Sequence, residues 1–86
     1  MDAALTSGEC LAVRERVIVA PTAGRFTPAG GTDTAQVEAD EVIGAIESVG
    51  RSTPVRSPFR GSLEGLLAHA GERVREGQPV AWLRLA

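Results

Sequence analysis

Arginine is the residue type in this sequence with the clearest chemical potential. All nine basic residues are arginines, and the 86 residues contain no lysine. Arg51, Arg56 and Arg60 follow one another closely, and a guanidinium binds carboxylates and phosphates through paired hydrogen bonds. One hypothesis is therefore a small-ligand module in which these three arginines form an anion site. The lack of lysine excludes a different kind of chemistry, since no side-chain amine is present to form an amide with a prosthetic group.

Other reactive residues give little support for catalysis. His69 stands between two alanines, with no second histidine at metal-ligand spacing and no serine or cysteine placed to pair with it. Cys10 is the only cysteine, so an internal disulfide and a zinc cluster are both excluded, and no adjacent base is present to activate its thiol. We expect no enzymatic activity, no metal and no cofactor.

The composition predicts a small all-β domain. A single domain of this size removes only about 60 to 65% of its unfolded surface from water. Apolar residues make up 43% of the chain but only Phe26, Phe59 and Trp82 are aromatic, so we expect a thin core of Val, Ile, Leu and Ala with Trp82 at one end. Ten glycines and five prolines are spread along the chain, which is typical of short strands joined by tight turns.

The charges divide unevenly along the chain. Residues 1–50 hold three arginines and eight acidic residues, whereas residues 51–86 hold six arginines and three acidic residues. Such an asymmetry can orient an encounter with a protein partner. The pI of 5.3 and the lack of a basic patch interleaved with aromatic residues argue against nucleic acid. No apolar stretch approaches the ~20 residues that span a bilayer, and the first residues do not resemble a secretory signal, so we expect a cytoplasmic protein without membrane contact.

An internal repeat sets the expected architecture. Shifting the sequence by 37 positions aligns apolar, proline and glycine residues of the two halves. The aligned pairs are Ile18 with Val55, Pro21 with Pro58, Gly24 with Gly61, Phe26 with Leu63, Val37 with Val74, Ile43 with Val80, Ala45 with Trp82 and Ile46 with Leu83. Two copies of one unit predict a closed domain with a pseudo-two-fold axis, because a solenoid needs three or more. We place this domain at residues 16–86 and expect residues 1–15 to form a flexible segment.

Local patterns mostly predict strands. The clearest are rich in β-branched or alternating apolar residues, and they lie at residues 16–20, 41–47 and 79–84. Residues 62–68 are ambiguous, since Leu63, Leu66 and Leu67 have helical spacing. Gly65 weakens a helix by about 1 kcal/mol relative to alanine, and the repeat aligns this stretch with a segment that contains proline and glycine. We therefore favour a strand.

Two segments are predicted to be turns or loops. Residues 27–34 contain a proline and two glycines and are expected to form a surface loop. Residues 48–54 have the composition of a hairpin tip, where Gly50 can adopt positive φ without steric cost.

The run from Ile46 to Gly61 resembles the attachment hairpin of the biotinyl/lipoyl carrier domains. In that family a glutamate lies three residues before the lysine that carries the prosthetic group, as Glu47 lies three residues before Gly50. Glu47-Ser48-Val49 is also similar to the Glu-Ser-Val-Lys sequence of glycine cleavage H proteins. This resemblance implies that Gly50 occupies the attachment position.

A second segment and the repeat extend the likeness. Residues 71–80 are similar to the Gly-x-x-Val-x-x-Gly-Gln-x-Val segment of biotin carboxyl carrier proteins and lipoyl domains. The resemblance covers about residues 16–85, including the internal duplication. It implies a flattened barrel-sandwich hybrid of two antiparallel sheets, with the hairpin tip at one end.

The chain departs from the family pattern at three places. Gly50 replaces the lysine, so attachment of biotin or lipoate is not expected. Val49 and Arg51 occupy positions that are methionines in the biotinyl motif, which leaves a permanent cation beside the attachment position. Asp40 stands where the first repeat usually has glycine, and aspartate tolerates turn conformations.

These features predict a carrier-like domain that works by protein contact. We expect a non-catalytic subunit of an enzyme complex of the carboxylase or acyltransferase type, with homo-oligomers as a further option for a thin core. The residues expected to contact the partner are Glu47, Val49, Arg51, Arg56, Phe59 and Arg60. Two alternatives stay open: a biotin carboxyl carrier-type subunit of acetyl-coenzyme A carboxylase in name and partners, and the anion-binding module described above.

Overall fold

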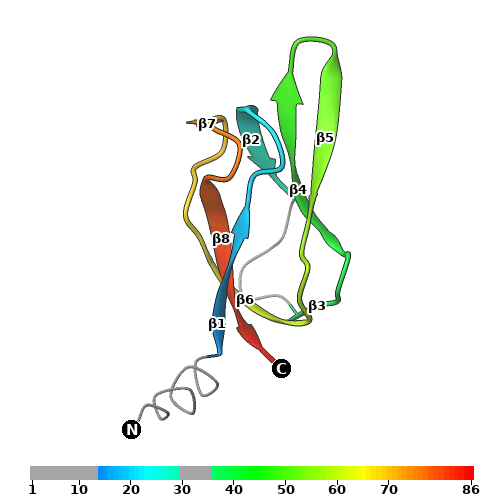
Figure 1. Ribbon diagram of the computed structural model, residues 1–86, viewed down its shortest axis with the longest axis vertical. Coiled ribbons are helices and arrows are strands. Elements are labelled where there is room, and N and C mark those ends of the chain that lie inside the picture. The colour runs from blue at the N-terminus through cyan, green and yellow to red at the C-terminus, as the bar shows by residue number, and fades with distance from the viewer. Residues whose placement is uncertain (1–13, 30–35) are drawn as a thin grey trace, which may run out of the picture.

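The residues that the structure describes form β-strands joined by turns, with no helix among them. The structure, a computed structural model, describes residues 14–29 and 36–86. Its strands are β1 (Glu15–Val19), β2 (Gly24–Pro28), β3 (Gln36–Val37), β4 (Val42–Ser48), β5 (Arg51–Arg56), β6 (Gly61–Leu66), β7 (Arg73–Val74) and β8 (Pro79–Leu85). They form two four-stranded antiparallel sheets, ordered β1-β8-β6-β3 and β5-β4-β2-β7 (Figure 1). The predicted all-β, flattened barrel-sandwich architecture is confirmed.

The amino-terminal prediction is only partly covered by the structure. The first strand begins at Glu15, one residue before the expected start of the domain. Residues 1–13, with Cys10, lie outside the described residues, so the flexible segment stays a prediction. The described residues contain no helix with the length and hydrophobicity needed to span a bilayer.

The pseudo-two-fold repeat is confirmed strand by strand. When the residue numbers of β3 and β4 are increased by 37, their bounds coincide with those of β7 and β8. β1 and β2, shifted in the same way, fall within β5 and β6. It also exchanges the two sheets, because each sheet takes strands from both repeats. Even the irregularities match: an extra residue interrupts the pairing at Ile43 in β4 and at Val80 in β8. Each repeat therefore contributes four strands, β1–β4 and β5–β8.

The turns that precede β4 and β8 are equivalent in detail. The Asp40 amide donates to the Ser57 carbonyl at 2.6 Å, and the Gly77 amide donates to the Ala20 carbonyl at 2.8 Å. Both turn residues are left-handed, with φ of 71° for Asp40 and 84° for Gly77. Asp40 thus adopts the same left-handed conformation as its repeat partner, Gly77, and the fold tolerates aspartate at this position.

The core is apolar and small, as expected. Its buried side chains are Ile18, Ala20, Phe26, Val37, Ile43, Ile46, Val55, Leu63, Ala68, Val74, Val80, Ala81 and Leu83. Phe26 is the one aromatic residue among them. Ser57 is buried as well, and its hydroxyl donates to the Phe59 carbonyl at 2.6 Å and accepts from the Phe59 amide at 3.2 Å. Its polar group is therefore satisfied within a local turn.

The prediction that Trp82 belongs to the core is wrong. Strand alternation puts Leu83 inside, so Trp82 lies half-buried on the outer face of β8, between Val17 of β1 and Gly65 of β6. A Cβ on Gly65 would lie 2.8 Å from the indole Nε1. The indole therefore packs over a glycine on the surface.

Two local predictions also have clear outcomes. The strand favoured over a helix near Leu66 is confirmed, with bounds of Gly61–Leu66. The loop expected at residues 27–34 is wrong at its start, because Thr27 and Pro28 pair with β4. Pro28 is tolerated there because β7 pairs only with Gly24 and Arg25, so no ladder bond is lost on that side. Residues 30–35 lie outside the described residues.

Candidate functional site

The tip of the β4–β5 hairpin is the most exposed feature of the predicted site. Ser48 pairs with Arg51, so Val49 and Gly50 form a two-residue turn. Figure 1 shows this tip extending beyond the other strands at one end of the molecule. Val49 is 103% exposed, and Gly50 has a φ of 69°. The tip therefore presents one apolar side chain and one residue without a side chain to solvent.

Gly50 sits in open space. A Cβ built on it would have no atom within 4 Å. A side chain at this position would therefore point into solvent without a clash, and the left-handed backbone is the only local obstacle to it. This is the steric environment that an attachment residue needs.

Glu47 and Arg51 lie next to the tip. The Glu47 carboxylate accepts a hydrogen bond from the Ser52 hydroxyl at 2.9 Å, across the β4–β5 pair. The Arg51 guanidinium has no hydrogen bond or ion pair to any residue of ranges 14–29 and 36–86. Together with Val49 these residues form one contiguous surface, which we call the tip surface.

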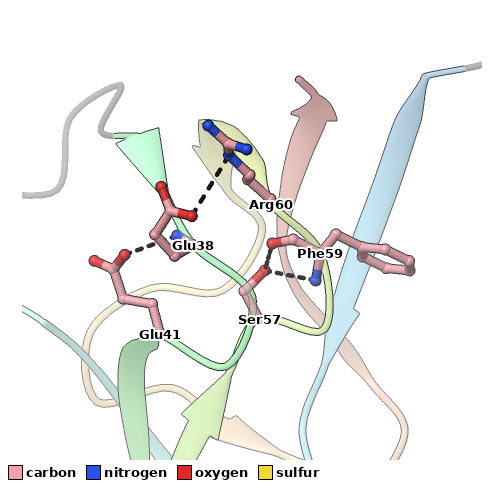
Figure 2. Close-up of polar contacts among 5 residues, drawn as sticks. All are labelled: Glu38, Glu41, Ser57, Phe59 and Arg60. Carbon is pink, nitrogen blue, oxygen red and sulfur yellow. Dashed lines mark hydrogen bonds and ion pairs between the residues drawn. The ribbon is translucent and has the colours of Figure 1, made fainter.

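The other three predicted contact residues lie far from the tip surface. Arg56 ends β5, and five strand residues from Arg51 span about 17 Å. Its guanidinium donates to the Asp40 carbonyl at 3.0 Å. Figure 2 shows Phe59 and Arg60 in the turn after β5, where Arg60 forms an ion pair with Glu38 at 3.5 Å.

Phe59 lies with Arg60 in the turn after β5, at the opposite end of this strand from the tip. Its ring packs against the core, and the Arg16 guanidinium lies 5.9 Å from the ring centroid. The structure therefore brings together Glu47, Val49 and Arg51 but not Phe59. It also separates Arg51 from Arg56 and Arg60, which contact Asp40 and Glu38, so the three arginines do not form one anion site.

Sequence reasoning missed two arginines beside the tip surface. Arg25 of β2 and Arg73 of β7 pair directly across the strands, and Arg25 pairs with Glu47 on its other side. They line a hollow of about 340 Å³ whose remaining walls include Ser48 and Val49. The repeat gave no signal for this pair, because the positions equivalent to Arg25 and Arg73 are Ser62 and Gln36.

The remaining reactive side chain has an ordinary structural setting. The His69 backbone amide donates to the Glu72 carboxylate at 2.8 Å, which closes an exposed turn. Within the residues that the structure describes, no three His, Cys, Asp or Glu side chains are grouped so as to hold a metal ion.

Comparison with known proteins yields structural likeness only. No family profile matches the sequence, and no curated protein does. Among solved structures, the urea carboxylase of Kluyveromyces lactis superposes with a TM-score of 0.71 at 24% identity, over 80% of this chain and 6% of that one. A single-chain, multi-domain long-chain acyl-CoA carboxylase superposes with a TM-score of 0.75 at 19% identity, over 95% of this chain and 8% of that one.

The fold is not confined to carboxylases. An aspartoacylase family protein from Mesorhizobium loti superposes with a TM-score of 0.67 at 22% identity, over 80% of this chain and 25% of that one. The chain thus spans less than a tenth of each carboxylase and a quarter of the aspartoacylase relative. These likenesses establish the fold alone.

Proposed function

We propose that this domain is a biotinyl/lipoyl carrier-like module that has lost its attachment residue and acts through protein contact. The observation that carries the proposal is Gly50 at an open, solvent-facing hairpin tip in a sequence without lysine. The carrier-like resemblance of residues 46–61 and the fold shared with two carboxylase chains support it.

The chemistry of attachment explains why the tip would not be loaded. Biotin and lipoate are held in their carriers by an amide to a lysine amine, and Gly50 supplies no amine. Arg51 does not substitute, because its guanidinium stays protonated and is a poor nucleophile. Under this proposal the domain has no cofactor and no catalytic role.

The tip retains what a docking surface requires. Val49 is fully exposed, and burying a valine side chain in a partner stabilises a complex by about 1.5 to 3 kcal/mol. Arg51 adds a cation with no partner among the described residues, so it is available for a carboxylate across the interface. We propose a partner in a carboxylase- or acyltransferase-type complex, with this domain as a structural or regulatory subunit in the cytoplasm.

Affinity purification from the native cell tests this proposal. The tagged domain is compared with Val49→Asp at the tip and with Val17→Asp, a half-exposed position on the outer face of the other sheet. We expect one defined protein to be retained by the parent and by Val17→Asp and to be lost from Val49→Asp. Retention by Val49→Asp, or loss only from Val17→Asp, contradicts contact through the tip.

Self-association is a second candidate, supported by the outer face of the β1-β8-β6-β3 sheet. Val17 is 50% exposed there, beside the half-buried Trp82. The same Val17→Asp variant separates the two cases, because a dimer through this face would dissociate in sedimentation velocity while Val49→Asp would not affect it.

A further inference from the structure

The hollow beside the tip surface contains an arrangement that the fold itself does not require. Arg25 and Arg73 are both exposed and lie directly opposite each other on β2 and β7. Like charges in directly opposed positions destabilise a sheet. A pair of guanidiniums in such a position is therefore better explained by what it binds than by what it contributes to folding.

The neighbouring acidic groups do not neutralise this pair. Glu47 also lines the hollow and is in register with Arg25, but its carboxylate is held by the Ser52 hydroxyl and forms no ion pair with Arg25. Glu72, which precedes Arg73, uses its carboxylate to accept the His69 amide. Two positive charges thus face one negative charge in the hollow.

The two guanidiniums differ in how firmly they are held. One Arg25 nitrogen donates to the Gly71 carbonyl at 3.1 Å, which fixes the group at the β7 side and leaves its other donors unused. The Arg73 guanidinium has no hydrogen bond or ion pair to any described residue. A ligand carboxylate can therefore be bound by one arginine that a backbone contact positions and by a second arginine whose donors are not used by any described residue.

We infer that Arg25 and Arg73 form a carboxylate-binding site for an acidic side chain of the protein that docks at the tip. A monoanionic carboxylate balances the one excess positive charge of the hollow, whereas a phosphate dianion would leave one excess negative charge beside Glu47. Because the hollow is open and its arginines are exposed, an isolated carboxylate gains little in competition with water. Val49 on the rim adds an apolar contact that only a longer segment can use.

This inference rests on the proposed function for the source of the carboxylate, but its test does not use the native partner. The test follows the arginine Nε–Hε signals by NMR during titration with an end-blocked hexapeptide that alternates glutamate and leucine. The same peptide with glutamine in place of glutamate is the neutral control, and acetate is the free-carboxylate arm.

We expect saturable shifts of the Arg25 and Arg73 signals with the glutamate peptide and none with the glutamine peptide. Arg73→Gln should weaken binding about tenfold, the loss of one charge-assisted hydrogen-bonded contact. Arg84→Gln is the matched control, since Arg84 is an exposed strand arginine on the other sheet, paired with Glu15. It should leave the affinity unchanged.

Several results overturn the inference. Equal shifts of all exposed arginines, shifts centred on Arg51, or unchanged binding by the Arg25→Gln/Arg73→Gln double variant each contradict this site. Acetate binding as tightly as the peptide would contradict a protein segment as the ligand. None of these results alters the Val49→Asp comparison, so failure of the site and failure of the proposed function are distinguishable.

Discussion

Replacing Gly50 with lysine should restore an attachment point at a measurable cost in stability. The new Cβ meets no atom within 4 Å, so the cost comes from the backbone alone. The φ of 69° is left-handed, where an L-residue costs roughly 1 to 2 kcal/mol. The greater unfolded-state entropy of glycine offsets roughly 0.5 to 1 kcal/mol of this. We therefore expect a decrease of about 1 kcal/mol in the free energy of unfolding, or roughly 4 to 8 °C in Tm for a domain of this size.

Gly77 provides a matched control for this variant. It is also left-handed, with φ of 84°, and its Cβ would also meet no atom within 4 Å, but it lies in the turn before β8. Gly77→Lys should therefore lose similar stability while placing its lysine away from the hairpin tip. Urea unfolding compares the two variants, and intact-mass measurement after incubation with biotin protein ligase, ATP and biotin reports attachment.

We expect a biotinyl adduct on Gly50→Lys and none on Gly77→Lys. If folded Gly50→Lys stays unmodified, or if both variants are modified alike, then Gly50 does not stand at a recognisable attachment position. A much larger loss of stability in Gly50→Lys than in Gly77→Lys would contradict the open environment of the hairpin tip.

Three further variants test the packing and turns of the fold. Asp40→Gly should raise the free energy of unfolding by up to about 1 kcal/mol in urea denaturation, because it removes a Cβ from a left-handed residue; a decrease would contradict strain at this turn. Ser57→Ala should lower the free energy of unfolding by about 1 to 3 kcal/mol, since it leaves the part-buried Phe59 amide without its acceptor; an unchanged urea midpoint would contradict a stabilising role for this hydrogen bond. Gly65→Ala should displace the single tryptophan, Trp82, and shift its fluorescence to longer wavelength; an unchanged spectrum would contradict the close packing.

The strands were predictable because each is marked either by the residue types within it or by its equivalence to a strand of the other repeat. The 37-residue shift predicted equivalent strands, and β-branched runs such as residues 16–20 fixed their type. Gly65 and the repeat together decided correctly against a helix near Leu66. Trp82 was misplaced because size suggested burial, whereas the position of a strand residue is set by alternation with its neighbours, here the buried Leu83.

The candidate site was predictable only where it lies within one hairpin. Val49, Gly50 and Arg51 are consecutive, so a turn prediction placed them together. Arg56 was grouped with them by proximity in sequence, but an extended strand separates its two ends. Arg25 and Arg73 meet across β2 and β7, which come from different repeats, and no local pattern predicts that pairing.

The most direct test of the central claim is the intact mass of the unaltered chain after co-expression with biotin and lipoate ligases and their cofactors. We predict the mass of the unmodified polypeptide, with a lysine-containing biotin carboxyl carrier protein and a lipoyl domain measured in parallel to show that both ligases are active. A mass increase equal to one biotinyl or lipoyl group on the unaltered chain would contradict the proposal that this carrier-like domain works without a tethered group.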